Sequence, residues 1–206
     1  MKVELHLHTH RYSPCAHHTP AEAMERLIRA GYGAVYITEH DAVWSDWELE
    51  ELASQFPPIR VFPGVEVATS PLPDERFQHL LVLGTNDRRY VELADRPAEI
   101  LARAAEEGCL TVLAHPYRWP GSAQMLKEGL LPDALEYHTC NHDSGMAEQA
   151  RLASAELSLP LVNAGDVHAL NFIGRFWTET DQPLQAAKDI RGIVLAGKYR
   201  NCTSAD

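Results

Sequence analysis

Short apolar runs alternate with helical stretches along most of the chain, and this alternation restricts the fold more than any other feature of the sequence. The runs are rich in Val, Leu and Ile, as buried strands are. Seven of them predict strands, at 3–8, 34–38, 61–67, 79–83, 110–114, 134–138 and 161–164. Strands that alternate with helices are typical of a parallel α/β sheet. We therefore expect either an open doubly wound sheet or a small closed barrel.

Helix signals lie between most of these runs. Thr19-Pro20-Ala21-Glu22 reads as a capping box that begins a helix ending near Ala30, and Ser45-Asp46-Trp47-Glu48 begins another that ends near Gln55. Further helices are expected over 97–107, 146–157 and 183–196, with a short one within 117–131. No glycine-rich phosphate loop follows any run, which excludes the commonest nucleotide-binding open sheets. We expect one domain over residues 1–206.

The charge of the chain excludes broad classes of partner. With 18 basic and 29 acidic residues the formal net charge is −11, which disfavours binding of long nucleic acid because phosphate contacts need clustered Lys and Arg. No apolar run is long enough for a membrane span, and the first residues resemble no signal peptide. The four cysteines are scattered. We expect a cytoplasmic protein with reduced thiols and no membrane association; the oligomeric state stays open.

Histidines, 11 in all, gather at the ends of the predicted strands. In a parallel α/β fold the carboxyl ends of the strands meet at one rim, where binding sites form. Residues two apart on a strand share a face, so each of the pairs His6/His8 and Asp166/His168 projects together. The predicted strand-end positions are His6, His8, His40, Glu66, His115, His138, Asp166 and His168. His79 is the exception, because it opens its predicted strand.

Imidazole and carboxylate groups collected at one rim are ligands for Zn, Mn or Fe. A single strand-end histidine is usually a structural residue with a hydrogen-bond partner, and we interpret His10, His18 and His142 in that way. The larger set is different. Unpaired buried polar groups each cost about 1–3 kcal/mol, so such a set without a metal would destabilise the fold.

The ordered motifs of the chain resemble those of the PHP (polymerase and histidinol phosphatase) superfamily, and among its members the small stand-alone metal-dependent phosphoesterases. The motifs run from residue 4 to about residue 178. They are Glu4-Leu5-His6-Leu7-His8-Thr9, Thr38-Glu39-His40-Asp41, Gly64-Val65-Glu66, Ala114-His115-Pro116 and Gly165-Asp166-Val167-His168. The resemblance implies a distorted seven-stranded (β/α)7 TIM-like barrel, with two or three divalent ions at its carboxyl-terminal rim.

The resemblance also implies a set of metal ligands. His6, His8 and Asp166 would bind a first ion, and Glu66 would bridge it to a second. His79 and His115 would complete the second site, and His40 and His168 would hold a third ion.

Two positions depart from the family pattern. A further ligand is expected after Ser13, where this chain has Pro14-Cys15-Ala16-His17-His18; we choose His17, with Cys15 and His18 as alternatives. His138 stands where it could be a ligand, a proton donor or neither.

The implied activity is hydrolysis of a small phosphorylated substrate, a phosphomonoester or short nucleotide, by a metal-bridging hydroxide. Glu66 and Asp166 would position the ions rather than act as nucleophiles. Arg11, Arg118 and Arg175 follow the motif strands and are candidates for binding the phosphate, because a guanidinium fork suits its oxygens.

Two other hypotheses compete with a phosphoesterase. An amidohydrolase-like enzyme acting on C–N bonds also begins with His-x-His, but that family carries a bridging lysine. The four lysines here, Lys2, Lys127, Lys188 and Lys198, lie at no mid-chain strand end. A non-catalytic PHP module stabilised by metal is the other alternative.

Overall fold

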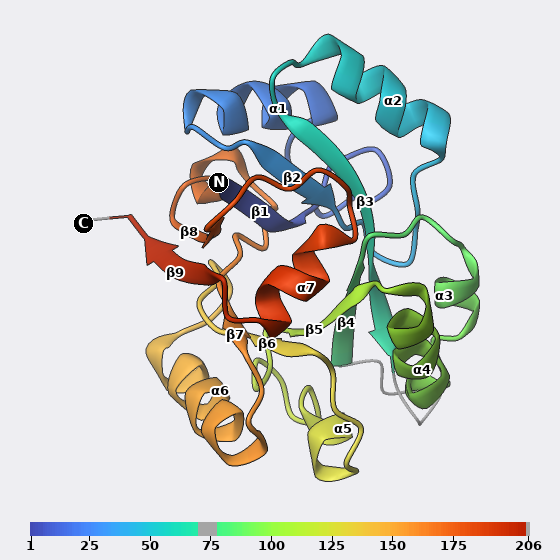
Figure 1. Cartoon of the computed structure of the whole chain (residues 1–206), viewed down its shortest axis with the longest axis vertical. Coiled ribbons are helices and arrows are strands. Elements are labelled where there is room, and N and C mark those ends of the chain that lie inside the picture. The colour runs from blue at the N-terminus through green and yellow to red at the C-terminus, as the bar shows by residue number, and fades with distance from the viewer. Residues whose placement is uncertain (70–77, 205–206) are drawn as a thin grey trace.

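The computed structural model describes residues 1–69 and 78–204, and strands within these ranges form one mixed sheet (Figure 1). The strands in chain order are β1 (Lys2–Leu7), β2 (Ala34–Ile37), β3 (Arg60–Thr69), β4 (Gln78–Leu83), β5 (Leu110–Ala114), β6 (Ala134–Glu136), β7 (Leu161–Val162), β8 (Phe176–Thr180) and β9 (Tyr199–Thr203). Their order in the sheet is β7-β6-β5-β4-β3-β2-β1-β8-β9. The prediction of an α/β fold is confirmed, but the prediction of seven strands is wrong, because β8 and β9 add a hairpin.

The sheet is nearly closed into a barrel. Beyond β7 the chain returns to β1, where His8 N donates to Val167 O at 3.1 Å and Val167 N donates to His6 O at 3.0 Å. At the opposite end of β1, β8 pairs antiparallel with Val3. Side chains join β9 to β7, since Asn201 Nδ2 and the Tyr199 hydroxyl both donate to Leu161 O. A TIM-like barrel is therefore the right general architecture.

The direction of β4 is the second departure from expectation. β1, β2 and β3 are parallel, and so are β5, β6 and β7, but β4 runs antiparallel to both β3 and β5. Parallel strands throughout were expected from the sequence. Eight residues lie between the end of β3 at Thr69 and the start of β4 at Gln78. A crossover between parallel strands needs about a dozen or more, so this spacing favours antiparallel pairing.

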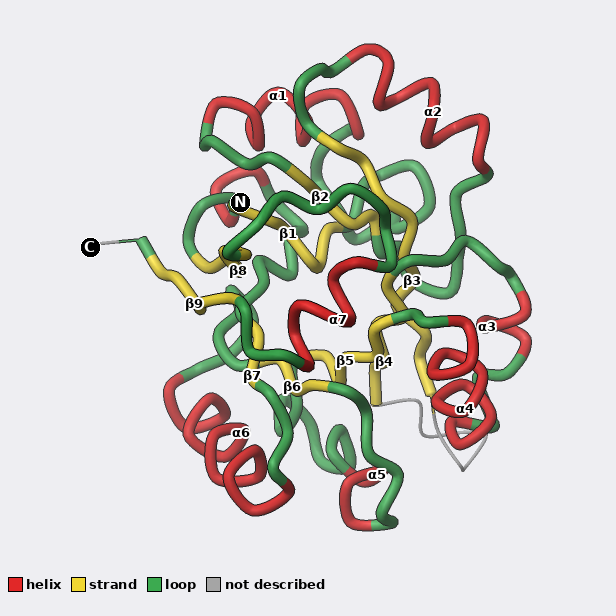
Figure 2. Tube along the Cα trace, in the orientation of Figure 1, coloured by secondary structure: helices red, strands yellow, loops and turns green. Residues whose placement is uncertain are grey.

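Helices surround the sheet in the tube of Figure 2, and the last of them lies across the centre of that view. They are α1 (Pro20–Arg29), α2 (Asp46–Gln55), α3 (Arg89–Glu92), α4 (Pro97–Glu107), α5 (Gln124–Lys127), α6 (Ser144–Leu157), the 3₁₀ helix η1 (Leu170–Phe172) and α7 (Asp189–Leu195). Both predicted capping boxes are confirmed: the Thr19 and Ser45 side chains accept from the backbone of Glu22 and Glu48. The last helix begins six residues later than expected, at Asp189, after a turn in which its carboxylate accepts from Gln185 N and Ala186 N.

Three apolar clusters hold these layers together. The interior of the barrel is filled from the strands by residues such as Leu5, Tyr36 and Leu81, and α7 closes one end with Ile190 and Val194 (Figure 1). A second cluster packs α4 and α6 on β3–β6, and a third packs α1 and α2 on β1 and β2. With one end of the barrel filled, the opposite rim is left for the polar strand ends. Within the described residues, no helix has the length and apolar composition to cross a membrane.

Candidate metal centre

The carboxyl ends of the parallel strands bring the predicted ligands to one rim. His6 lies in β1 and His8 directly follows it, while His40 follows β2 and His115 follows β5. Glu66 lies within β3, where an isolated bridge pairs it with His40. Because β1 is buried on both faces, neither His6 nor His8 is accessible to solvent.

The reversed β4 explains the one histidine that did not fit the strand-end pattern. His79 pairs with Ala68 of β3 on one side and with Ala114 of β5 on the other. An antiparallel strand begins where its neighbours end, so a residue at the start of β4 lies at the same rim. His79 therefore reaches the site from the second position of its strand.

Glu66 is the centre of this cluster. Its Oε1 lies 2.8 Å from His79 Nδ1 and 3.0 Å from His115 Nε2. Its Oε2 lies 2.8 Å from His40 Nδ1, 3.2 Å from His8 Nε2 and 3.3 Å from His6 Nε2. One fully buried carboxylate is thus surrounded by five imidazoles from four segments of the chain.

Asp166 forms a second centre beside Glu66. Its Oδ1 lies 3.2 Å from His168 Nδ1 and 3.5 Å from His6 Nε2. Its Oδ2 accepts from Asn141 Nδ2 at 2.6 Å and lies 3.6 Å from Arg118 Nη1. The carboxylate is held from one side by neutral and cationic donors, while its other oxygen faces the histidines.

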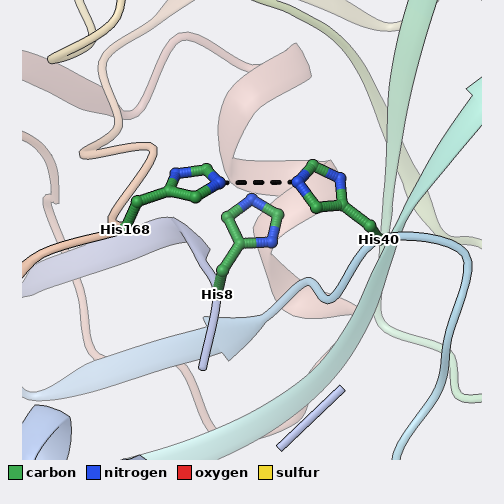
Figure 3. Close-up of side chains that lie close together, drawn as sticks. All are labelled: His8, His40 and His168. Carbon is green, nitrogen blue, oxygen red and sulfur yellow. Dashed lines mark hydrogen bonds between the residues drawn. The ribbon is translucent and has the colours of Figure 1, made fainter. Parts of the chain in front are cut away.

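A third group contains imidazoles alone. Figure 3 shows the rings of His8, His40 and His168 converging from three separate segments, with 3.4 Å between His40 Nε2 and His168 Nε2. In all, the cluster contains eight of the nine predicted metal ligands, which are His6, His8, His40, Glu66, His79, His115, Asp166 and His168.

The donor atoms of the cluster fit divalent ions. Glu66 Oε2 and Asp166 Oδ1 are buried and have no hydrogen-bond partner, although several ring nitrogens lie close to them. The Nε2 atoms of His6 and His8 are 3.0 Å apart. Two nitrogens bound to one ion at about 2.1 Å lie about 3.0–3.4 Å apart, so this separation suits a shared ion. Unsatisfied oxygens beside converging lone pairs are what a cation would stabilise.

The pKa values of the cluster also indicate a site that attracts positive charge. Burial alone would lower the pKa of His6, but Asp166, Glu66 and Glu136 raise it well above its ordinary value. Burial alone would raise the pKa of Glu66 and of Asp166, but the imidazoles, His6 foremost, hold both well below their ordinary values. The buried carboxylates thus attract positive charge, which bound protons or bound metal can provide.

Glu136 on β6 is a part of the site that the sequence analysis missed. Its Oε1 lies 2.9 Å from His6 Nδ1, and its Oε2 accepts from His115 N at 2.6 Å. An ionised carboxylate only accepts, so this contact places a proton on His6 Nδ1 and leaves Nε2 free to bind metal. The sequence signal that could have identified it is a carboxylate within the apolar run 134–138, which predicts a buried strand.

Two residues of the centre adopt a backbone conformation that non-glycine residues rarely occupy. The φ angle is 27° at His115 and 47° at Asp166. Residues in this region cost of order 1–3 kcal/mol each and persist where the surroundings hold them in place. The turns that carry these two side chains into the cluster are therefore strained, as is common at functional sites.

A cavity of about 410 Å³ opens onto the cluster. Arg118 and Trp119 line it, together with Asn141 and Phe172. The Arg118 guanidinium lies over the Trp119 ring, 4.3 Å from its centroid. This is the size of a cavity that holds a small organic ligand.

The other two predicted phosphate-binding arginines lie elsewhere. Arg11 donates to Glu48 through Nε at 2.9 Å, and Arg175 is exposed and donates to Asn171 O at 3.1 Å. Among the described residues that line the cavity, Arg118 is the one arginine.

The three candidate ligands in the loop after Ser13 lie outside the ligand clusters. Cys15 and His17 line the cavity and are exposed, but neither belongs to the ligand clusters found among the described residues. His18 is buried, and burial lowers its pKa. His138 lies against Phe176, with 5.6 Å between ring centroids, rather than in the cluster. Of the three candidates, the chosen His17 and the alternative Cys15 line the cavity, and the alternative His18 does not.

The comparisons with known proteins give a likeness of fold. No protein-family model matches the chain, and no curated protein matches it in sequence. Among solved structures, PsfC from Pseudomonas syringae is 18% identical with a TM-score of 0.68, covering 99% of this chain and 91% of its own. An amidohydrolase from Chromobacterium violaceum, with bound sulfate and no metal, is 15% identical with a TM-score of 0.65, covering 100% and 99%.

A third solved structure is a candidate metal-dependent phosphoesterase from Bifidobacterium adolescentis. It is 15% identical with a TM-score of 0.61, and the match covers 93% of this chain and 94% of that one. At such identities the likeness shows a shared fold. Together with the cluster, it defines an α/β barrel protein with a histidine and carboxylate centre suited to divalent metal.

Proposed function

We propose that the protein is a metal-dependent phosphoesterase of the PHP superfamily that hydrolyses a small phosphate ester. The observation that carries this proposal is the pair of buried carboxylates, Glu66 and Asp166. Each is surrounded by imidazoles, and each has an oxygen without a hydrogen-bond partner. Two or three divalent ions, Zn, Mn or Fe, fit this set of nitrogen and oxygen donors.

The ligand groups suggest how the ions would be held. His6, His8 and Glu66 form one set, and His40, Glu66 and His79 form another that shares the same carboxylate. When bound, divalent ions would supply Lewis-acid stabilisation of the phosphoryl oxygens and lower the pKa of water. Asp166, with His115 and His6, would form a further ligand set.

The remaining polar groups of the cavity suit a phosphoryl group. Arg118 presents a guanidinium fork to the cavity, and Asn141 donates to Asp166 and so fixes the orientation of that carboxylate. Hydrolysis would break the P–O ester bond; the oxygen of water stays on phosphorus, and a proton leaves with the alcohol. The names of two neighbours agree with this chemistry: one is a candidate metal-dependent phosphoesterase, and the other binds sulfate, a tetrahedral oxyanion like phosphate.

The amidohydrolase-like alternative is less well supported. One structural neighbour is named an amidohydrolase, but the bridging lysine of that family has no counterpart here. Among the described residues that line the cavity there is no lysine. Lys2 lies instead over the ring of Trp177, 3.8 Å from its centroid.

Elemental analysis joined to a phosphoester panel tests the proposal. The panel contains 4-nitrophenyl phosphate, its bis ester, histidinol phosphate, nucleotides and short single-stranded DNA. We expect two to three equivalents of metal and hydrolysis that EDTA abolishes. His8→Ala and Glu66→Ala should each lose at least about 100-fold in kcat/KM, because each removes a ligand from the core of the cluster.

His138→Ala is the matched control, because this histidine is packed on Phe176 away from the cavity. It should keep the activity of the wild type. A protein without bound metal, or with activity unchanged in both ligand variants, would refute the proposal. Metal binding that raises the melting temperature without any hydrolysis would favour the non-catalytic module instead.

A further inference from the structure

A second cavity adjoins the metal centre and shares a wall with it. This cavity, about 350 Å³, lies beside α5 and is lined in part by Gln124, Lys127 and Gln149. Arg118 and Trp119 line both this cavity and the one over the metal centre. The two cavities therefore adjoin at these two side chains.

The charge of the second cavity is unusual for this protein. Its described lining residues include the cations Arg118 and Lys127 and no carboxylate, although the chain carries a net charge of −11. Lys127 is exposed, and its ammonium group has no hydrogen bond or ion pair with any residue of the described ranges. The nearby carboxylate of Glu128 accepts from Gln124 Nε2 at 3.1 Å. Lys127 is thus a free cation at the far side of the shared wall.

The shared wall is aromatic and is held in place from the metal side. The Trp119 ring lies 5.3 Å from the ring of His115 and 5.5 Å from that of His79, measured between centroids. Arg118 covers it from another side and is itself 3.6 Å from Asp166. An indole fixed in this way offers surface for a planar group to pack on.

We propose that the second cavity is a subsite for the leaving group of the phosphoester, and that it favours a planar leaving group bearing a negative charge. The inference rests on the proposed function, which places the phosphoryl group at the metal centre. The aromatic part of the leaving group would pack on Trp119, and its anionic substituent would face Lys127. Leaving groups with a positive charge would be disfavoured by Arg118 and Lys127 together.

Binding of non-hydrolysable aryl phosphonates tests this subsite without requiring turnover. Phenylphosphonate and 4-carboxyphenylphosphonate, and the same pair built on biphenyl for longer reach, are titrated calorimetrically into the metal-loaded protein. At least one carboxylated ligand should bind about three- to fivefold more tightly than its neutral partner. This is the upper part of the range that one solvent-exposed ion pair provides.

Variants of Lys127 assign the effect to this residue. Lys127→Gln should bring the affinity ratio close to one, and Lys127→Glu should reverse the preference. Lys198→Gln is the matched control, because Lys198 is also exposed and lines a separate cavity beside α7. This control should keep the affinity ratio of the wild type. Added salt should bring the wild-type ratio closer to one, because salt screens exposed charges.

The outcomes separate the subsite from the proposed function. If 4-nitrophenyl phosphate is hydrolysed but the affinity ratio is close to one, or is unchanged in Lys127→Gln, the subsite is refuted and the function stands. A ratio that depends on Lys127 in a protein that hydrolyses no phosphoester supports the subsite and refutes the function. If no phosphonate of either length binds, the subsite is refuted.

Discussion

Glu136 and Glu4 are buried carboxylates beneath the rim that hold residues of the cluster in place. Glu136 contacts His6 and the backbone of His115, so it orients two ligands without itself lying in the cavity lining. Glu4, two residues before His6 on β1, accepts from His6 N and Gly165 N. A side chain at Gly165 would meet both Val167 and Glu4, which explains why glycine stands there.

Glu4 leads to a pH prediction at the residue scale. Its burial raises the pKa to about 7, partly offset by the backbone donors Gly165 and His6. The folded state therefore holds a proton that the unfolded state loses above about 4.5. The contribution of Glu4 to stability is present at low pH, falls as the pH rises through about 4.5 to 7, and is lost above that range.

Glu4→Gln should remove this dependence, because the amide oxygen can still accept from both backbone donors and carries no charge. Relative to the wild type, its free energy of unfolding should rise by up to about 3 kcal/mol between pH 4.5 and pH 8. Urea unfolding of the metal-free proteins at pH 5 and pH 8 measures the difference. Parallel pH profiles of the two proteins would contradict the raised pKa.

The sequence located most residues of the cluster because they stand at strand ends in recognisable motifs. It did not identify Glu136, whose role depends on contacts across 130 residues of sequence to His6 and 21 to His115. The choice of His17 as a metal ligand stays a prediction. The path of the loop after Ser13 depends on tertiary contacts such as the 2.8 Å hydrogen bond from His17 N to His168 O, which no local pattern encodes.

At the scale of elements, the two capping boxes differ in what their glutamates contact. Glu48 at the start of α2 accepts from Ser45 N at 2.8 Å and Ser45 Oγ at 2.7 Å. It also accepts from the Tyr12 hydroxyl at 2.8 Å and from Arg11, and so ties α2 to the loop after β1. Glu22 at the start of α1 accepts from Thr19, with 2.7 Å to its backbone nitrogen.

Glu48→Ala should therefore destabilise the protein by about 1–2 kcal/mol, since it removes a cap and the partner of two further side chains. Glu22→Ala, the matched control in the other box, should cost less. Urea unfolding at pH 7 compares them, and equal losses would contradict a linking role for Glu48. Against the effect of burial, Ser45, Tyr12 and Arg11 lower the pKa of Glu48 to about 2. Its contribution is thus present above about 4.5 and lost as the pH falls towards 2.

Element prediction succeeded where apolar runs or caps were strong and failed at β8 and β9. β8 reads Phe-Trp-Thr-Glu-Thr and β9 reads Tyr-Arg-Asn-Cys-Thr. Aromatic and β-branched residues favour strands, but a hairpin that is polar on one face lacks the apolar run of a buried strand. The reversal of β4 was likewise invisible in its composition, because Gln-His-Leu-Leu-Val-Leu is equally suited to either direction.

On the scale of the whole molecule, contacts between β9 and the segment after β7 help to close the barrel. Asn201 on β9 accepts from Asn163 N at 2.7 Å, and Asn163 Nδ2 donates to Cys202 O at 3.1 Å. The cluster at the rim likewise joins β1, β3, β5 and the segment after β7. Ions bound there would link parts of the fold that are distant in sequence, so metal and stability should be coupled.

Removal of metal should therefore lower the melting temperature. An ion present at 1,000 times its dissociation constant stabilises the folded state by about 4 kcal/mol, which is about 8–16 °C for a chain of this size. Calorimetry of the EDTA-treated protein, before and after addition of Zn²⁺ or Mn²⁺, measures the shift. Glu66→Gln should reduce it, and the absence of a shift with either ion in the wild type would contradict a metal-linked fold.

The reversed β4 also has a consequence for the order in which the site assembles. Glu66 and His79 are 13 residues apart and lie on neighbouring antiparallel strands, whereas the contact between His6 and Glu136 spans 130 residues. Contacts that close short loops cost less chain entropy and can form earlier during folding. We expect β3 and β4 to bring Glu66 and His79 together while the rest of the rim is still unformed, so that the cluster grows outward from Glu66.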